Sequence, residues 1–423
     1  MKTFSSFAHR FTKESGITEL MQDLGDAINS NDPEICMLGG GNPAIIPKVM
    51  DVFRQETQAL IDNQQWNQSL GYYSSPQGDT KFISALVDFL NDRYHWNLTT
   101  KNIALSNGSQ NSFFYLFNLL AGEMPDGSQK KILFPLSPEY IGYRDLGLSD
   151  DMFVSKKPKI KFLDGQQFKY HINFDALEIT DDIAAICVSR PTNPTGNVIT
   201  DDELKQLDRL AKQHNIPLII DNAYGLPFPG AIYTDTKLHW HDNIILSMSL
   251  SKLGLPGVRT GITIAKEEII GIITKMNATL CLAPNNMGAS LLTRLLKTKE
   301  ILSLRNQFIR PFYEKKMRNA LALAQKIFEE LPVHIHKPEG AFFLWLWLDG
   351  LPITSKVLYR RLKNKKVLVI PGEDFFIGID EQWPHQYQCL RINYALSDEQ
   401  LERGLSIIAT EVSALYALQA SNE

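Results

Sequence analysis

The stretch Ile216-Pro217-Leu218-Ile219-Ile220-Asp221-Asn222-Ala223-Tyr224-Gly225 decides the fold class of this chain. Its short apolar run ends abruptly in a carboxylate, which is typical of a buried strand with Asp221 at its C-terminal end. Open α/β sheets bind their ligands beyond the C-terminal ends of their strands. The stretch therefore predicts an α/β protein with a small-molecule site that contains Asp221.

Two further runs, one on each side of this strand, carry polar residues. Upstream, Ser189-Arg190-Pro191-Thr192-Asn193-Pro194-Thr195-Gly196 follows the apolar residues 184–188, and its two prolines and one glycine fix a turn that presents Asn193. Downstream, Ser249-Leu250-Ser251-Lys252-Leu253-Gly254-Leu255-Pro256-Gly257-Val258-Arg259 sets a lysine among serines, a Gly/Pro turn and an arginine. An amine bonds an aldehyde carbon, whereas hydroxyl and guanidinium groups hold phosphate. Lys252 is therefore interpreted as the Schiff-base lysine of a phosphate-bearing aldehyde cofactor.

Length, composition and charge favour an enzyme of small molecules. With 423 residues, 44% hydrophobic and 21% charged, the chain can bury a substantial core and is expected to form two domains. Its net charge of -4 gives no electrostatic footprint for nucleic acid or an anionic membrane. The four cysteines form no Cys-x-x-Cys pair, which indicates neither a zinc site nor a disulfide framework. We expect a cytoplasmic location, because residues 1–10 lack a secretory h-region and the longest apolar run, 341–348, falls short of the ~20 residues that cross a bilayer.

Hydrophobic patterning divides the chain near Arg310-Pro311. Before it, strand-like runs at 102–105, 131–134 and 243–248 alternate with helical stretches, which predicts a mainly parallel sheet covered on both faces. After it, a charged helical pattern at 313–330 predicts a smaller α+β unit. The other elements expected in that unit are strands around 343, at 367–370 and at 389–393, and a last helix at 397–418.

The three runs in this order, Asn-Pro-Thr-Gly, then Asp-x-x-Tyr, then Ser-x-Ser-Lys with its arginine, resemble the fold-type-I aminotransferases that use pyridoxal 5'-phosphate. The resemblance covers nearly the whole chain and continues in Asn107-Gly108-Ser109-Gln110, Ser137-Pro138-Glu139-Tyr140-Ile141-Gly142-Tyr143 and Arg391-Ile392-Asn393-Tyr394. It implies a large cofactor-binding domain at 51–310, whose mainly parallel sheet is sandwiched by helices, and a small α+β domain at 311–423. The N-terminal segment 1–50 is expected to contribute to the small domain.

The resemblance also implies the contacts of the cofactor ring. Lys252 would bond the cofactor and move the proton of the α-carbon. Asp221 would lie against the pyridine nitrogen, where a buried carboxylate keeps the ring protonated. Tyr224 and Asn193 would donate hydrogen bonds to the 3-oxygen of the ring, and Tyr140 would stack on its face. Lys252, Asp221 and Tyr224 are thus the expected catalytic residues.

An anion site is needed for the phosphate. The residues Gly108-Ser109-Gln110 lead directly into an apolar helix expected at 113–120, and backbone donors at a helix N-terminus bind phosphate. A plain helix cap is the alternative for this triplet alone. By resemblance, Ser249, Ser251 and Arg259 bind the phosphate as well, and Arg259 can form a bidentate contact that lysine could not reproduce.

Substrate contacts follow from the same resemblance. Arg391 would bind the α-carboxylate, although an internal salt bridge stays open for a strand-borne arginine. Gly41 would let the backbone approach the substrate, and Asn193 would lie beside it. Tyr73 would reach the phosphate of a neighbouring subunit, with Tyr72 as the alternative register, so that a homodimer is expected.

The activity implied is transamination between amino acids and 2-oxo acids by ping-pong kinetics. Three stretches, 38–43, 134–140 and 337–347, resemble one branch of the family, in which L-valine and pyruvate give 3-methyl-2-oxobutanoate and L-alanine. Aminotransfer from other aliphatic or aromatic amino acids, or C–S lyase chemistry with the same cofactor, are the alternatives. The histidine pairs at 239 and 241 and at 334 and 336 do not indicate a metal, because neither has a third ligand nearby in the sequence.

Overall fold

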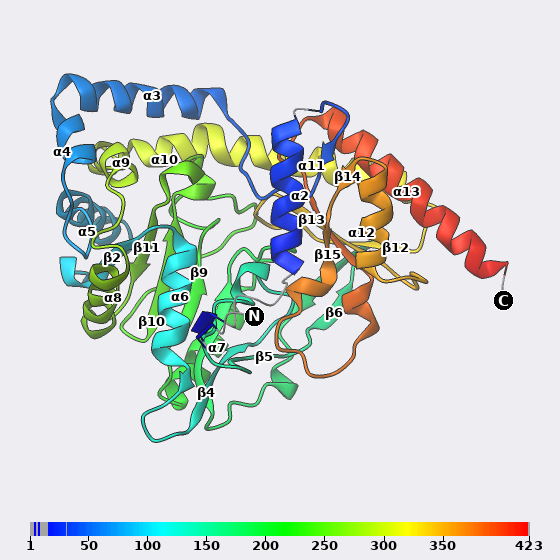
Figure 1. Cartoon of the computed structure of the whole chain (residues 1–423), viewed down its shortest axis with the longest axis horizontal. Coiled ribbons are helices and arrows are strands. Elements are labelled where there is room, and N and C mark those ends of the chain that lie inside the picture. The colour runs from blue at the N-terminus through cyan, green and yellow to red at the C-terminus, as the bar shows by residue number, and fades with distance from the viewer. Residues whose placement is uncertain (1–3, 6, 9–15, 31, 422–423) are drawn as a thin grey trace.

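An eight-stranded and a six-stranded β-sheet, with a further two-stranded sheet and helices around them, make up the described part of the protein (Figure 1). The computed structural model describes residues 4–5, 7–8, 16–30 and 32–421. Parts of the N-terminal segment expected at 1–50, and most of residues 1–10, therefore lie outside the described residues. In the described ranges, no helix is both long and apolar enough to span a membrane.

The large sheet has the strand order β2-β11-β10-β9-β8-β4-β3, with β5 paired to β4. β4, β5, β8, β9 and β10 run parallel, whereas β2, β11 and β3 pair antiparallel, so the expected mainly parallel sheet is confirmed. The strands are β2 (Ile103–Ser106), β3 (Gly122–Glu123), β4 (Gln129–Phe134), β5 (Phe153–Ser155), β8 (Ile183–Ser189), β9 (Leu218–Asp221), β10 (Ile244–Ser249) and β11 (Gly261–Ile264).

Both faces of the large sheet are buried. Along β2, Ile103 and Leu105 belong to one apolar cluster and Ala104 to another, which is the alternation expected of a strand with helices on each side. The α-helices bounded within the described residues are α2 (Gly16–Ser30), α3 (Pro47–Asp62), α4 (Gln65–Gly71), α5 (Thr80–Tyr94), α6 (Ser109–Leu120), α7 (Asp201–Gln213), α8 (Glu267–Leu280), α9 (Met287–Lys297), α10 (Glu300–Leu304), α11 (Arg310–Ile327), α12 (Ser355–Asn364) and α13 (Asp398–Ala420).

The second sheet has the order β15-β16-β13-β12-β7-β6. Its first two strands in the sequence come from residues 159–171, inside the range 51–310 that was expected to form the large domain; the domain boundaries stay a prediction. The strands are β6 (Lys159–Phe162), β7 (Gln167–His171), β12 (Val333–His336), β13 (Phe343–Leu348), β15 (Ile370–Pro371) and β16 (Cys389–Asn393).

The single strand expected at 367–370 is wrong, because two short strands replace it. β14 (Val367–Leu368) pairs with β1 (Cys36–Met37), and β15 pairs with β16. Residues 367–371 therefore pair first with β1 and then with β16. The main chain of Val369 lies so close to Gly39 that a Cβ there would be 3.2 Å from the Val369 carbonyl. The switch therefore brings the Gly39 segment against the second sheet.

The N-terminal residues that the structure describes pack on C-terminal elements. In α2, Asp23 accepts hydrogen bonds from Tyr359 and Lys363 of α12, at 2.6 Å each. The helix expected at 313–330 is α11, which follows a π-helical turn at Arg305–Ile309 directly and ends at Ile327. Ser397 caps α13 by accepting from the Gln400 N–H.

Candidate active site

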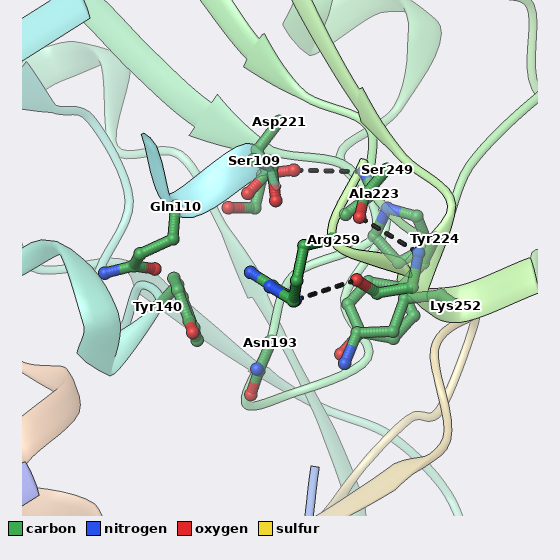
Figure 2. Close-up of a pocket in the computed structure, with 13 residues that line it drawn as sticks. Ser109, Gln110, Tyr140, Asn193, Asp221, Ala223, Tyr224, Ser249, Lys252 and Arg259 are labelled. Atoms are coloured by element: carbon green, nitrogen blue, oxygen red, sulfur yellow. Dashed lines mark hydrogen bonds between the residues drawn. The ribbon is translucent and has the colours of Figure 1, made fainter. Parts of the chain in front are cut away.

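The C-terminal ends of β8, β9 and β10 and the start of α6 surround a pocket of about 590 Å³ (Figure 2). Strand register sets Ser189, Asp221 and Ser247 side by side, because Ser189 and Ser247 both pair with Asp221. The loops that follow carry Asn193, Tyr224 and Lys252 over the strand ends. The residues lining the pocket are Ser109, Gln110, Tyr140, Ser189, Pro191, Asn193, Asp221, Ala223, Tyr224, Ser249, Ser251, Lys252 and Arg259.

Lys252 lies in a single 3-10 turn, η4 (Ser251–Leu253), directly after β10. Its Nζ donates a 2.8 Å hydrogen bond to the carbonyl of Gly41 and lies 5.3 and 5.5 Å from the ring centroids of Tyr224 and Phe342. Burial, together with the positive charge of Arg391, lowers the pKa of Lys252 to about 8. A much larger fraction of this amine is neutral near pH 7 than of an ordinary lysine, as a nucleophile requires.

Asp221 ends β9 at the floor of the pocket. Oδ1 accepts from the N–H of Ala223 at 3.0 Å, and Oδ2 accepts from the hydroxyl of Tyr143 at 2.6 Å. Burial raises the pKa of Asp221, against the effect of the Tyr143 hydrogen bond. A protonated ring nitrogen above the carboxylate would compensate this burial.

Tyr224 and Asn193 contribute donors at the opposite side of the pocket. The Tyr224 hydroxyl is buried and has no hydrogen-bond partner in the described part of the chain. Asn193 uses its side-chain oxygen to accept from Nη1 of Arg391 at 2.8 Å, so its amide nitrogen is the atom left for a ligand. Both groups can therefore donate to one ligand oxygen.

The start of α6 and three polar side chains form the expected anion site. Gly108 precedes α6 with a φ of 96°, and a Cβ there would lie 2.3 Å from Nη2 of Arg259, so glycine permits the arginine to approach the helix N-terminus. Nη1 of Arg259 lies 3.4 Å from Oγ of Ser251, and Oγ of Ser249 accepts from the Ser251 N–H at 3.1 Å. Among the described residues Arg259 forms no ion pair, which leaves its charge for an anion.

Two other predicted contacts of the cofactor, Gln110 and Tyr140, also line this pocket. Gln110 donates from Nε2 to the carbonyl of Gly142 at 2.8 Å, which joins α6 to the segment after Tyr140. The Tyr140 ring meets the Tyr143 ring edge-on, with 5.2 Å between centroids. A Cβ at Gly142 would be 2.3 Å from the Tyr140 ring, so the glycine makes room for the aromatic residue.

Arg391 lies on β16 and is 5% exposed. Nη1 and Nη2 donate to Oδ1 of Asn193 and to the Gly39 carbonyl at 2.8 and 2.7 Å, and the guanidinium lies 4.3 Å from the Phe343 ring centroid. Nε has no partner in the described residues. These acceptors are neutral, so the internal salt bridge left open from the sequence is not formed. A buried cation with neutral partners favours a bound carboxylate.

Gly41, Tyr72 and Tyr73, like Gly108 and Arg391, are not among the residues that line the pocket. A Cβ on Gly41 would meet nothing within 4 Å, so the surrounding protein does not itself require glycine there. Tyr72 and Tyr73 are 72% and 82% exposed. The expected contact of Gly41 with substrate and of Tyr73 with a neighbouring subunit stay predictions.

Comparison with known proteins identifies the family. The model of aminotransferases of class I and II matches residues 35–408. The chain belongs to this family. This aminotransferase is 50% identical over 98% of its length to the valine–pyruvate aminotransferase of Escherichia coli (strain K12), 99% of which is covered.

Two solved structures resemble this aminotransferase over almost their whole length. A putative amino-acid aminotransferase from Psychrobacter arcticum 273-4 is 46% identical, with a TM-score of 0.96 over 99% of this chain and 100% of that one. A valine–pyruvate aminotransferase from Salmonella typhimurium LT2 is 49% identical, with a TM-score of 0.88 over 95% and 100% of the two chains.

Aminotransferases of this family use pyridoxal 5'-phosphate, and the pocket residues fit it. The unpartnered Tyr224 hydroxyl and the Asn193 amide suit the ring oxygen, and the α6 N-terminus with Arg259 suits a phosphate. Asp221 suits a protonated ring nitrogen, and Lys252 suits the aldehyde carbon. These four features converge on one cavity, as a single ligand with four different functional groups requires.

Several residues of the site carry no local signal in the sequence from which a role could be predicted. Ser189, Pro191 and Ala223 line the pocket, and Tyr143 bonds Asp221 from 78 positions away in the sequence. Glu139 lies behind Ser189 and bonds it. Glu139 and Tyr143 belong to the segment 137–143, which carries part of the family resemblance, and this was the one signal that could have pointed to them. The spacing of residues in the sequence does not predict that Tyr143 contacts Asp221 or that Glu139 contacts Ser189.

Proposed function

We propose that this aminotransferase exchanges the amino group between L-valine and pyruvate, forming 3-methyl-2-oxobutanoate and L-alanine. The observation that carries the proposal is 50% identity over 98% of the chain to a valine–pyruvate aminotransferase. At this level of identity the pocket geometry described above is expected to serve the same reaction.

The pocket residues would divide the work as follows. Pyridoxal 5'-phosphate, when bound, withdraws electrons from the amino acid and makes its α-proton acidic. Lys252 would take that proton from the α-carbon, because its neutral amine is a base near pH 7. Asp221 would hold a proton at the ring nitrogen, and Tyr224 would donate to the ring oxygen.

Arg391 would fix the α-carboxylate of every substrate. Its two guanidinium nitrogens have neutral acceptors, and a planar carboxylate matches the guanidinium fork. Binding there would hold the α-carbon of the amino acid beside the Lys252 amine, which converts proton transfer into an intramolecular step.

An aliphatic side chain suits the surface next to Lys252. A second, shallow hollow borders Lys252 and is lined mainly by apolar groups. They are Ala44, Ile46, Val49, Met50, Leu253, Ile309 and Tyr313, together with Gly254. Lys252 is the one charged group in this lining, so a carboxylate-bearing side chain would find no second cation there. Apolar walls favour valine over a dicarboxylic amino acid by removing methyl groups from water.

The working unit is proposed to be a homodimer in the cytoplasm. Large apolar side chains are exposed around the Tyr72 loop, including Leu70 (57%) and Leu282 (60%), as are Tyr72 and Tyr73 themselves. Asn286 donates to the Tyr72 carbonyl and Asn285 bonds Asn107, so this loop lies near the start of α6. A second copy would cover this surface and receive Tyr73 at its phosphate. A reducing compartment suits the four free cysteines.

Steady-state kinetics with a panel of amino acids and pyruvate test the substrate assignment. We expect pyruvate-dependent loss of valine with ping-pong kinetics, and lower kcat/KM for aromatic and dicarboxylic amino acids. Valine rates indistinguishable from those of phenylalanine or aspartate would contradict the pair. Oxo-acid release from cystathionine without an acceptor would instead identify a C–S lyase. One methylene changes kcat/KM by only about 10- to 200-fold, so activity with neighbouring aliphatic amino acids is expected.

A further inference from the structure

Two consecutive phenylalanines, Phe342 and Phe343, pack against the same residue of the active site. Their ring centroids lie 5.2 and 6.0 Å from that of Tyr224, and 4.9 Å from each other. Successive side chains of an extended strand point to opposite faces. The main chain must therefore turn directly before β13, which begins at Phe343.

The turn lies at Ala341, which is fully buried and has a φ of 56°. This is the left-handed region of the backbone, which glycine adopts freely and which a residue with a Cβ disfavours. Such a conformation persists only where the surrounding structure holds it in place. The contacts of Ala341 should therefore include the groups that maintain the turn.

Two tyrosine hydroxyls hold the carbonyl of Ala341. Tyr233 donates to it at 2.5 Å and Tyr394 at 3.0 Å, from positions 108 and 53 residues away in the sequence. A carbonyl oxygen has two lone pairs, so it can accept both protons. If one hydroxyl instead donates to the other across the 3.2 Å between their oxygens, the second still donates to the carbonyl. Neither hydroxyl has another acceptor among the described residues, so the carbonyl is the final acceptor in both arrangements.

Main-chain contacts connect this turn to the loops of the pocket. The N–H of Ala341 donates to the carbonyl of Ala231 at 2.8 Å. A Cβ at Gly340 would lie 2.4 Å from the ring of Pro191, which lines the pocket. These contacts fix the start of the turn. The two hydroxyls fix its end, because the Ala341 carbonyl lies in the same peptide plane as the N–H of Phe342.

The ring of Phe342 lies between helix α11 and the reactive groups. It stacks on Tyr313 of α11, with 5.2 Å between centroids and 22° between planes, and Nζ of Lys252 lies 5.5 Å from its centroid. Tyr224 meets the same ring nearly edge-on, at 73°. Lys252 and Tyr224 are neighbours in the pocket (Figure 2). A displaced Phe342 would therefore leave the ring of Tyr224 without one of its supports.

We propose that Tyr233 and Tyr394 are positioning residues: their hydroxyls hold Ala341 in the left-handed turn that packs Phe342 against Tyr224, and so direct the Tyr224 hydroxyl into the pocket. The Tyr224 hydroxyl is buried and has no hydrogen-bond partner in the described residues, so the packing of its ring sets its position. This inference rests on the proposed role of Tyr224 as the donor to the ring oxygen of the cofactor.

Fluorine-19 NMR can follow the position of Phe342 in the cofactor-free protein, with 4-fluorophenylalanine incorporated at position 342 alone. We expect the resonance to shift in the double variant Tyr233→Phe, Tyr394→Phe, because the carbonyl loses both donors. Adding Ala341→Gly should return it toward the wild-type position, since glycine adopts the left-handed turn without help. An unchanged resonance in the double variant would overturn the proposal. Should the double variant fail to fold, Tyr233→Phe alone removes the shorter contact and gives the same comparison.

Tyr416→Phe is the matched control. The Tyr416 hydroxyl also donates to a main-chain carbonyl, that of Asp349, at 2.8 Å, but it belongs to the C-terminal helix α13 and does not line the pocket. Its removal should leave the fluorine resonance at position 342 unchanged. A shift as large as that of the double variant would mean that the loss of any tyrosine hydroxyl disturbs this ring, which would contradict a specific role of Tyr233 and Tyr394.

The effect on Tyr224 is measured in the loaded protein, from the pH midpoint at which the imine of Lys252 and the cofactor loses its proton and changes its visible absorption. A donor to the ring oxygen stabilises the anion that forms, so loss of the donor raises the midpoint. Tyr224→Phe should raise it by about 1 to 2 pH units. The double variant Tyr233→Phe, Tyr394→Phe should raise it by less, and Ala341→Gly should restore it.

The two measurements separate this inference from the function on which it rests. If the double variant moves the fluorine resonance but not the midpoint, Phe342 does not act on Tyr224 and the proposal is overturned. An unchanged midpoint in Tyr224→Phe would instead refute the role of Tyr224 at the ring oxygen. The fluorine resonance would then still decide whether Tyr233 and Tyr394 position Phe342.

Discussion

Arg391 donates a 2.8 Å hydrogen bond from Nη1 to the side-chain oxygen of Asn193. This contact joins β16 of the second sheet to the turn after β8 of the large sheet. Because the guanidinium has only donors, it fixes the orientation of the amide, whose nitrogen then faces the pocket (Figure 2). The residue proposed to bind the substrate carboxylate therefore also orients a donor to the cofactor.

Asn193→Asp should disrupt both functions of this contact. The new carboxylate would pair with Arg391, cancel the charge that a substrate needs and remove the donor to the cofactor. We expect KM to rise for amino acids and oxo acids alike, by about 10- to 100-fold for a loss of 1.5 to 3 kcal/mol. Asn193→Ala is the comparison, since it removes the donor and leaves Arg391 charged. Equal KM values in the two variants would contradict the pairing.

Lys252→Met should stabilise the cofactor-free protein at neutral pH. The pKa of Lys252 falls to about 8 in the folded protein, below its ordinary value, so the charged form is disfavoured by folding. This cost, roughly 3 kcal/mol, is fully present below pH 8 and disappears as the pH rises from 8 to about 10.5. Urea denaturation from pH 6 to pH 10 should show the advantage of the variant shrinking above pH 8. Lys205→Met, at an exposed lysine of α7, is the control and should show no such trend.

Asp221→Asn should bind the cofactor but react slowly. A neutral amide cannot hold a proton on the ring nitrogen, and the loss of a charged hydrogen bond worth about 3 kcal/mol reduces the rate by on the order of 100-fold. Single-turnover deamination of valine measures this step apart from product release. A wild-type rate constant in this variant would remove Asp221 from the ring nitrogen.

Arg391→Lys should weaken the binding of all substrates to a similar degree. Valine, alanine and their oxo acids share the carboxylate and differ only in the side chain, and lysine cannot form the planar double contact. The expected change is a KM about 10-fold higher or more for each substrate, with the ratio between substrates preserved. A change in preference among side chains with normal carboxylate affinity would place Arg391 elsewhere in the site.

Mixing two inactive variants tests the homodimer. If Tyr73 serves the neighbouring subunit, Lys252→Ala and Tyr73→Ala chains should regain activity on subunit exchange, because one site in each mixed dimer receives Lys252 and Tyr73 from different chains. Tyr72→Ala takes the place of Tyr73→Ala if the register differs by one residue. Activity that stays at the sum of the separate variants, with exchange verified by native mass spectrometry, would mean that each site is built from one chain.

The sequence predicted the elements whose pattern is local. The apolar runs before Asp221 and before Lys252 became β9 and β10, and residues 389–393 became β16. Ten of the predicted site residues line one pocket because they end strands, lie in the loops that follow strands, or begin a helix, and the sheet topology fixes these positions. They are Ser109, Gln110, Tyr140, Asn193, Asp221, Tyr224, Ser249, Ser251, Lys252 and Arg259.

Tertiary structure alone decided which of these groups meet. Residues 159–171 lie between strands of the large sheet in the sequence but pair into the second sheet, and residues 367–370 divide between two partners. The contacts of Tyr143 with Asp221 and of Arg391 with Asn193 span 78 and 198 positions. Periodicity and motifs indicate whether a segment forms a helix or a strand and which of its faces is buried. They were therefore enough to predict the strands, the cofactor lysine Lys252 and the carboxylate Asp221. Hydrogen bonds between distant side chains depend on strand order and packing, and these became known only from the folded chain.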